Sequence, residues 1–79
     1  MREIKIGQKY RHFKGNLYKV IDIVYDSESD YNNLKKIVIY QDLYKKDLKW
    51  ARNYEMFNSE VDHNKYPGVE QKYRFEEVK

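Results

Sequence analysis

Residues 17–25 read Leu-Tyr-Lys-Val-Ile-Asp-Ile-Val-Tyr, and this stretch decides the fold. It is rich in β-branched and aromatic residues, which are favoured in β-strands. Only Lys19 and Asp22 interrupt its apolar character, so apolar side chains occur on both faces of the predicted strand. A strand of this kind must be covered on both sides, or it must bend between two sheets.

Turn signals on either side divide the rest of the chain into further short strands. A Gly15-Asn16 pair, which signals a two-residue hairpin loop, precedes this strand, and a polar loop at residues 26–34 follows it. Lys45-Lys46-Asp47 and Pro67-Gly68 predict two later turns. Four other patterned runs complete a set of five predicted strands, and they lie at residues 8–14, 36–42, 48–53 and 72–77.

The spacing of these strands predicts a small all-β architecture. Met56 and Phe57 are adjacent and break the alternation within residues 54–61, which favours a short helical turn that plugs one end. Five short strands at this spacing favour a barrel or sandwich, and a long bent strand shared by two small sheets is typical of SH3-like barrels. We therefore predict an all-β, SH3-like β-barrel of about five strands with one helical turn. It occupies residues 1–79 as a single domain, because 79 residues do not suffice for two.

Composition limits how such a domain can be stabilised. A chain of 79 residues buries only about 60–65% of its unfolded surface, so its stability margin is small. Cysteine is absent, which excludes disulfides and thiolate metal sites. Nine tyrosines dominate the aromatic content, and a ring with a polar tip suits the boundary of a small barrel. The alternation, with the break at Met56-Phe57, predicts eight side chains that are mostly buried: Phe13, Val20, Ile23, Ile37, Ile39, Leu48, Phe57 and Phe75.

Hydropathy and charge bear on location and on partners. No apolar run approaches the roughly 20 residues of a membrane helix. The charged start, residues 1–5, precedes no hydrophobic run, so we expect no signal peptide, no membrane contact and a cytoplasmic location. The net charge is +3, with basic excess in residues 1–20 and 35–52 and acidic excess in residues 21–34 and 53–79. This alternation either builds separate basic and acidic faces or is the mixed charge of an ordinary soluble surface.

The chain also resembles a known family. The segment Tyr10-Arg11-His12-Phe13-Lys14-Gly15-Asn16, followed by Tyr18 and Val20, resembles the opening of the small bacterial proteins called domain of unknown function 1653. The resemblance covers nearly the whole chain, and its later motifs are Ser27-Glu28, Val38-Ile39-Tyr40-Gln41, Leu43-Tyr44, Trp50, Arg52, Met56-Phe57, Tyr66-Pro67-Gly68 and Arg74-Phe75. It implies a bacterial protein with an SH3-like barrel, and it supplies no established activity.

Cationic and aromatic side chains are interleaved along several predicted strands. Tyr10, His12 and Lys14 share one face of the first strand. Trp50 and Arg52, two residues apart, share a face of another. Aromatic rings beside cations can stack on bases and pair with phosphates, or can hold an acidic or Pro-rich peptide, but they can equally be cross-strand pairs that stabilise a sheet. The predicted ligand-binding residues are Tyr10, Arg11, His12, Lys14, Tyr40, Tyr44, Trp50 and Arg52.

Catalysis and metal binding find weaker support in the sequence. His12 with a carboxylate could act as an acid–base pair, but such work needs a second positioned group and a pocket. The chain has no Gly-rich phosphate loop, no Gly-x-Ser-x-Gly elbow and no Cys/His cluster. We therefore expect no catalytic residue, no metal and no cofactor. Carboxylates and histidine can bind divalent metals, and the chain has one such group in Glu55, Glu60, Asp62 and His63. The spacing of these residues matches no known metal-binding loop.

These patterns favour a non-enzymatic binding module that recognises a protein or peptide partner through an aromatic, cation-rimmed surface. The alternative is a small barrel that binds nucleic acid, and a small hydrolytic enzyme is the least favoured function. Lysine provides twelve of the sixteen basic residues, whereas nucleic-acid readers more often use arginine forks. Salt dependence separates the two kinds of binding, because nucleic-acid binding weakens steeply as salt rises.

Overall fold

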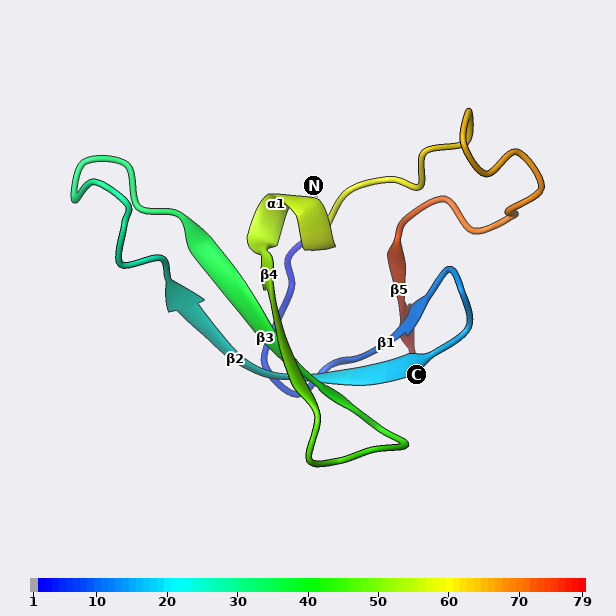
Figure 1. Cartoon of the computed structure of the whole chain (residues 1–79), viewed down its shortest axis with the longest axis horizontal. Coiled ribbons are helices and arrows are strands. Elements are labelled where there is room, and N and C mark those ends of the chain that lie inside the picture. The colour runs from blue at the N-terminus through cyan, green and yellow to red at the C-terminus, as the bar shows by residue number, and fades with distance from the viewer. Residues whose placement is uncertain (1) are drawn as a thin grey trace.

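The computed structural model describes residues 2–79, and its strands form one antiparallel sheet in the order β4-β3-β2-β1-β5 (Figure 1). The predicted all-β class, with five strands and one helical turn, is therefore confirmed. In the part of the chain that the structure describes, no helix is long and apolar enough to cross a membrane. The elements are β1 Lys9–His12, β2 Leu17–Tyr25, β3 Lys36–Asp42, β4 Lys49–Asn53, α1 Tyr54–Phe57 and β5 Phe75–Val78.

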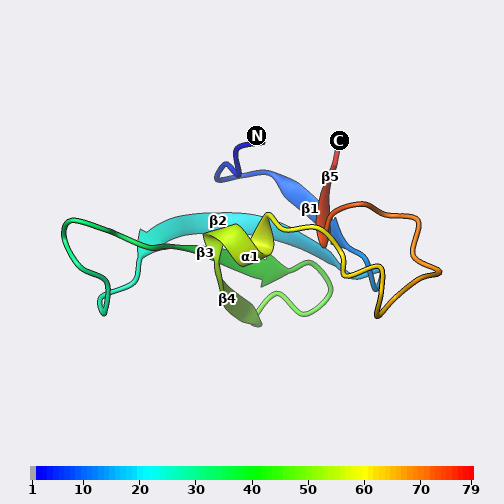
Figure 2. The same ribbon diagram turned by 90° about the horizontal axis from the view of Figure 1, so that it is seen from above.

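Strand β2 is the longest strand and belongs to both halves of the sheet. Its first residues pair with β1, while β3 pairs with it along almost its whole length. The ladder to β3 passes from Val20 opposite Tyr40 to Asp22 opposite Ile39, which leaves Ile21 as a β-bulge. A bulge bends its strand and increases the local twist, and Figure 2 shows β2 as one long curved ribbon. The prediction of a bent strand shared by two halves of the fold is confirmed.

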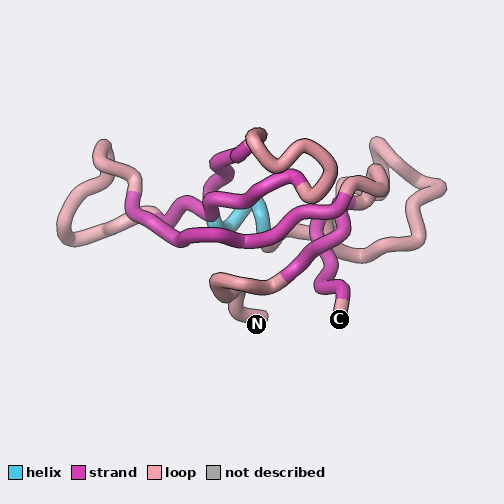
Figure 3. The backbone as a smooth tube through the Cα atoms, turned by 90° about the horizontal axis from the view of Figure 1, so that it is seen from below, coloured by secondary structure: helices cyan, strands magenta, loops and turns pink. Residues whose placement is uncertain are grey.

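The sheet does not close into the predicted barrel, which corrects that part of the prediction. Strands β4 and β5 are its two edges, and the ladders of residues 2–79 include no pairing between them. The long segment 58–74 stands between these strands in the chain, and its isolated bridge joins Glu60 to Tyr73 rather than to either edge. Figures 2 and 3 show the two longest connections, residues 26–35 and 58–74, at opposite ends of the sheet.

The β1–β2 hairpin turns through Phe13, Lys14 and Gly15. The N–H of Gly15 donates to the carbonyl of His12 at 2.7 Å, and the N–H of His12 donates to the carbonyl of Asn16 at 2.9 Å. Gly15 has a φ of 108°, which residues with a Cβ rarely adopt. This is the pattern of a three-residue hairpin loop that ends on a glycine at positive φ. The predicted turn is confirmed, although its loop has three residues rather than two.

Helix α1 is a single turn that carries Phe57 into the interior. The side-chain oxygen of its N-cap, Asn53, accepts hydrogen bonds from the backbone N–H groups of Glu55 and Met56. Asparagine is favoured at this position because the first N–H groups of a helix lack partners within the helix. Phe57 is buried and Met56 is exposed, as expected for two adjacent side chains on one helical turn. The predicted helical turn is confirmed.

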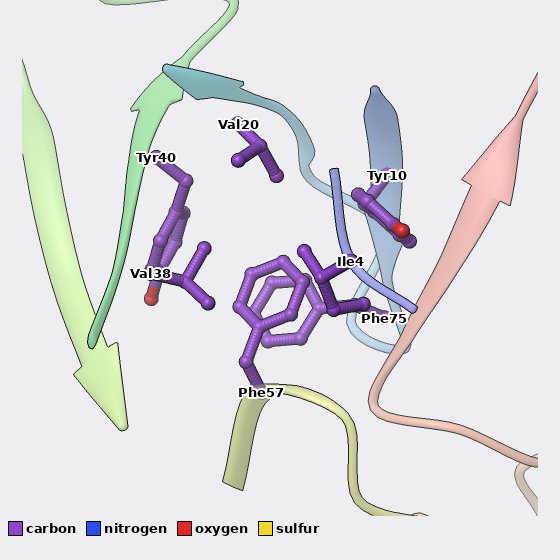
Figure 4. Close-up of a cluster of buried hydrophobic side chains, with 7 residues drawn as sticks. All are labelled: Ile4, Tyr10, Val20, Val38, Tyr40, Phe57 and Phe75. Carbon is purple, nitrogen blue, oxygen red and sulfur yellow. The ribbon is translucent and has the colours of Figure 1, made fainter. Parts of the chain in front are cut away.

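The core is built mainly from aromatic rings, as Figure 4 shows. The rings of Phe57 and Phe75 are stacked, with centres 4.0 Å apart and planes 8° apart. Tyr10 and Tyr40 each pack edge-on against Phe57, with ring centres 5.3 Å away. Such edge-to-face contacts contribute about 0.5–1.5 kcal/mol beyond the burial of area. The core cluster consists of Ile4, Tyr10, Val20, Val38, Tyr40, Phe57 and Phe75.

The predicted core is confirmed in part. Val20, Phe57 and Phe75 are fully buried. Leu48 lies before the start of β4 and is 36% exposed, so its prediction as a core residue is wrong. The other four predicted core residues are only partly buried, and they are Phe13, Ile23, Ile37 and Ile39.

In β3 the predicted side-chain alternation has the wrong phase. Val38 and Tyr40 face the core, and the neighbouring isoleucines of β3 face the other way. The reason is the pairing with β2, in which Val38 lies opposite Ile23 and Tyr40 lies opposite Val20. Residues directly opposite each other in an antiparallel pair project to the same face of the sheet.

Candidate functional site

A pocket opens between the β1–β2 hairpin, β4 and the residues that lead into β5. Its volume is about 260 Å³, and four cationic side chains and one carboxylate are among its lining residues. The pocket therefore lies where the sheet fails to close between its two edge strands. We name it the basic pocket, and its lining residues are His12, Phe13, Lys14, Arg52, Asp62, Lys65, Tyr66 and Arg74.

Arg52 reaches the basic pocket from β4, where it lies opposite Val38. Its Nε donates a hydrogen bond to the hydroxyl of Tyr40 at 3.4 Å, and its guanidinium carbon lies 5.7 Å from the ring centre of Phe75. These contacts hold the planar guanidinium group against the edge of the core. Among residues 2–79, no carboxylate lies within 4.0 Å of Arg52, so its charge has no ion-pair partner there.

Arg74 enters the basic pocket from the position just before β5. Its backbone N–H donates to the carbonyl of Ser59, and its carbonyl accepts from the N–H of Phe13, both at 2.9 Å. The side-chain Nε is buried and finds no hydrogen-bond partner among the described residues. A buried donor without a partner costs about 1–3 kcal/mol. This cost is carried by the fold at the base of the pocket, next to the start of β5.

His12 lies opposite Phe75 in the β1–β5 ladder, and the two ring centres are 4.9 Å apart. Its Nδ1 accepts a hydrogen bond from the backbone N–H of Lys14 at 3.1 Å, so the neutral ring carries its proton on Nε2. The pKa of His12 is lowered from 6.5 to about 4, first by burial and then by the positive charges of two arginines and Lys14. At neutral pH the ring is therefore an uncharged hydrogen-bond donor beside several cations.

Stability below neutral pH tests this state of His12. A histidine in the unfolded chain takes up a proton near pH 6.5, whereas His12 in the fold does so near pH 4. The unfolded state binds more protons between these values, so the free energy of unfolding falls as the pH is lowered from about 6.5 to about 4. His12→Gln keeps a polar side chain that does not titrate, and it is expected to show a shallower fall over this range.

Urea denaturation at a series of pH values measures the two slopes. The matched control is His63→Gln, because His63 is exposed on the loop, and this variant is expected to keep the slope of the unmodified protein. If His12→Gln and the unmodified protein lose stability equally, then His12 is not held neutral by the fold.

The structure brings together only part of the predicted binding surface. Three of the eight predicted residues line the basic pocket, and they are His12, Lys14 and Arg52. Arg11 lies on the other face of β1, because successive side chains of a strand alternate. Trp50 on β4 is 46% exposed and Tyr44 in the β3–β4 turn is 87% exposed, but neither lines the pocket.

Tyr10 and Tyr40 do not present a binding surface, which corrects the prediction for these two residues. Only 2% of Tyr10 and 5% of Tyr40 is exposed. Burial raises the pKa of Tyr10 to about 12, in keeping with a ring in the core. Both strand positions face inward, with Tyr10 opposite Tyr18 and Tyr40 opposite Val20. For these two tyrosines the alternative of cross-strand packing is the correct one.

The sequence patterns missed one wall of the basic pocket. The rings of Phe13 and Tyr66 lie 5.0 Å apart, and Nζ of Lys14 lies within 6 Å of both ring centres, at 5.9 and 5.8 Å. Phe13 had been predicted as a core residue. The residues without any earlier assignment to a binding surface are Asp62, Lys65, Tyr66 and Arg74. Three of them come from a loop whose position no local pattern reveals.

A larger hollow of about 320 Å³ lies at the far end of the sheet, and it gathers none of the predicted binding residues. Its lining includes two cations, Lys35 and Lys36, and one carboxylate, Glu55. Its lining contains no histidine and no arginine. The basic pocket is therefore the stronger candidate for a charged ligand. Within residues 2–79, no cluster of three His, Asp or Glu side chains is arranged to hold a metal ion.

Comparison with known families gives a match over nearly the whole chain. The family described as "Protein of unknown function (DUF1653)" matches residues 8–77. No curated protein and no solved structure matches the chain. The matched range includes every residue that lines the basic pocket.

Proposed function

The chain belongs to the DUF1653 family of proteins of unknown function, and we propose that it is a binding module for an acidic segment of a protein partner. The observation that carries the proposal is the basic pocket, in which four cations and an aromatic wall meet a single carboxylate. Arginine pairs with a carboxylate through two parallel hydrogen bonds. An Asp or Glu side chain of the partner fits the charge of Arg52 and Arg74.

An exposed aromatic residue extends this surface beyond the pocket. Trp50 precedes Arg52 by two residues, so both side chains project from the same side of β4. Nearly half of Trp50 is exposed, and a large rigid ring supplies contact area at a low cost in conformational entropy. When the partner places an acidic residue in the basic pocket, the adjacent residues of the partner segment lie along β4 and contact Trp50.

Nucleic acid is the second candidate ligand, and the rings of Phe13 and Tyr66 beside Lys14 favour it. Aromatic rings stack on bases while cations pair with phosphates. The shape of the pocket weighs against this candidate, because four cations that converge on one pocket fit a single anionic group better than the extended backbone of a nucleic-acid strand. An acidic protein segment therefore explains the geometry better.

A titration of the full chain with defined ligands tests the proposal. A short glutamate-rich peptide is expected to shift the backbone NMR signals of the β1–β2 hairpin and of Arg74, whereas a glutamine-rich peptide of equal length is not. Arg52→Gln is expected to weaken the binding about tenfold or more, because hydrogen bonds to charged groups contribute about 1.5–3 kcal/mol. Lys45→Gln removes the same charge from the exposed β3–β4 turn, and it is expected to bind normally.

Single-stranded RNA is the competing ligand in this experiment. With four or five phosphate contacts, its affinity would fall by roughly a hundred-fold for a fourfold rise in salt. RNA binding of that kind, without binding of the glutamate peptide, would contradict the proposal. Thermal melting of each variant is measured alongside, so that a loss of fold is not counted as a loss of binding.

A further inference from the structure

The positive charge of the basic pocket exceeds what one carboxylate neutralises. Four cations line the pocket, and Asp62 is the one carboxylate among the lining residues that the structure describes. Within residues 2–79, no carboxylate oxygen lies within 4.0 Å of a charged side-chain nitrogen of these four residues. A ligand carboxylate adds one negative charge, whereas a phosphorylated side chain carries a charge of about −1.5 to −2 at pH 7.

The hydrogen-bond donors of the pocket come from three separate parts of the chain. Arg52 approaches from β4 with its planar guanidinium group. Arg74 lines the pocket from the position before β5 with a second guanidinium group. His12 approaches from β1 with its Nε2 proton, since Nδ1 already accepts from Lys14. Three sources of donors match the three acceptor oxygens of a phosphoryl group better than the two of a carboxylate.

We propose that the basic pocket is a phosphoryl-binding site that holds a phosphorylated side chain of the protein partner. This inference rests on the proposed function and identifies the acidic group that the pocket recognises. Arg52 and Arg74 pair with phosphoryl oxygens, and the Nε2 proton of His12 is donated to a third. The wall of Phe13 and Tyr66 contacts the apolar part of the phosphorylated residue.

The protonation of His12 gives a readout that does not depend on affinity. In the free protein, burial and the charges of Lys14, Arg52 and Arg74 keep the ring neutral. The other charged groups of the same pocket are Asp62 and Lys65. A bound phosphoryl dianion offsets the cations around the ring, so the pKa of His12 is expected to rise on binding. A merely structural histidine would not respond to the ligand in this way.

The test compares two acidic peptides that differ at one position, with phosphoserine in one and glutamate in the other. In calorimetry with the full chain, the phosphoserine peptide is expected to bind about tenfold or more tightly. NMR titration of the His12 ring is expected to show a larger rise in its pKa with that peptide than with the glutamate peptide, because the phosphoryl group carries more negative charge. Arg74→Gln is expected to remove most of the preference, and Lys45→Gln is expected to retain it.

Asp62→Asn is a second variant, and it is expected to change phosphoserine binding in the opposite direction to Arg74→Gln. The Oδ1 of Asp62 accepts hydrogen bonds from the backbone N–H groups of Asn64 and Lys65, and asparagine keeps this oxygen. The substitution removes a negative charge from the pocket. It is therefore expected to strengthen phosphoserine binding a few fold, which corresponds to the usual free-energy contribution of one exposed charge pair. This gain remains measurable even if Arg74→Gln does not fold.

Each other outcome overturns the inference in a recognisable way. Equal affinity for the two peptides would remove the phosphoryl assignment and leave the acidic-segment proposal in place. Absence of binding by either peptide would remove both. Inorganic phosphate that binds as tightly as the phosphoserine peptide would assign the pocket to the free ion. Tighter binding of single-stranded RNA than of the phosphoserine peptide would assign it to nucleic acid.

Discussion

Phe57→Ala is expected to lower the free energy of unfolding by about 3–5 kcal/mol. Phe57 is fully buried, its ring stacks on Phe75 at 4.0 Å, and Tyr10 and Tyr40 pack against it. Its removal leaves a cavity at the centre of an interdigitated aromatic cluster, which short backbone elements cannot collapse to fill. Because small domains have a total stability of about 5–15 kcal/mol, this loss takes up a large part of the margin.

The matched control is Met56→Ala, the neighbouring residue on the same helical turn. Met56 is 51% exposed, so its truncation is expected to change stability by only about 0.5 kcal/mol. Urea denaturation followed by far-ultraviolet circular dichroism measures both variants. A loss below about 1 kcal/mol for Phe57→Ala, or equal losses for the two variants, would show that this ring is not at the centre of the core.

Gly15→Val is expected to cost about 1–3 kcal/mol, the usual cost of holding a residue in a disfavoured backbone conformation. Gly15 has a φ of 108° in the β1–β2 hairpin, where a β-branched residue is a strong outlier. A Cβ added at this position meets no atom within 4 Å. The loss therefore arises from the backbone conformation alone and not from a clash with a neighbour.

Gly68→Val isolates that cause. A Cβ at Gly68 also meets no atom within 4 Å, but the φ of Gly68 is not positive, so this variant is expected to be within about 0.5 kcal/mol of the unmodified protein. The two variants are compared by thermal melting under identical conditions. Equal melting temperatures would mean that the positive φ at Gly15 does not constrain the hairpin.

The strands and the first turn were predictable because their signals are local. The predicted strand at residues 36–42 coincides with β3, and the predicted turn glycine has a positive φ. Both depend on the preferences of single residues and of their immediate neighbours. The inward face of β3 was not predictable, because Ile37-Val38-Ile39-Tyr40 is apolar at every position and has no alternation to read. Its phase is set by pairing with β2.

The candidate site was predictable only where strands carry it. His12 and Arg52 lie on strands, and Lys14 lies in the hairpin loop that directly follows one. The rest of the pocket depends on the segment 58–74, which has no hydrophobic period. Its position is fixed by long-range contacts such as the hydrogen bond from the N–H of Phe13, in the β1–β2 hairpin, to the carbonyl of Arg74 at 2.9 Å. Such contacts leave no trace in the local pattern.

The half-exposed position of Trp50 makes its fluorescence emission sensitive to a bound partner. Trp50 is the chain's single tryptophan, and it lies at the edge of the sheet rather than in the core. Because Trp50 is 46% exposed, its ring can lose contact with water when a partner binds and can gain it when the chain unfolds. A segment that covers β4 would shield the same ring and shift its emission. The protein therefore carries a natural fluorescent label beside Arg52, where binding can be followed without any added dye.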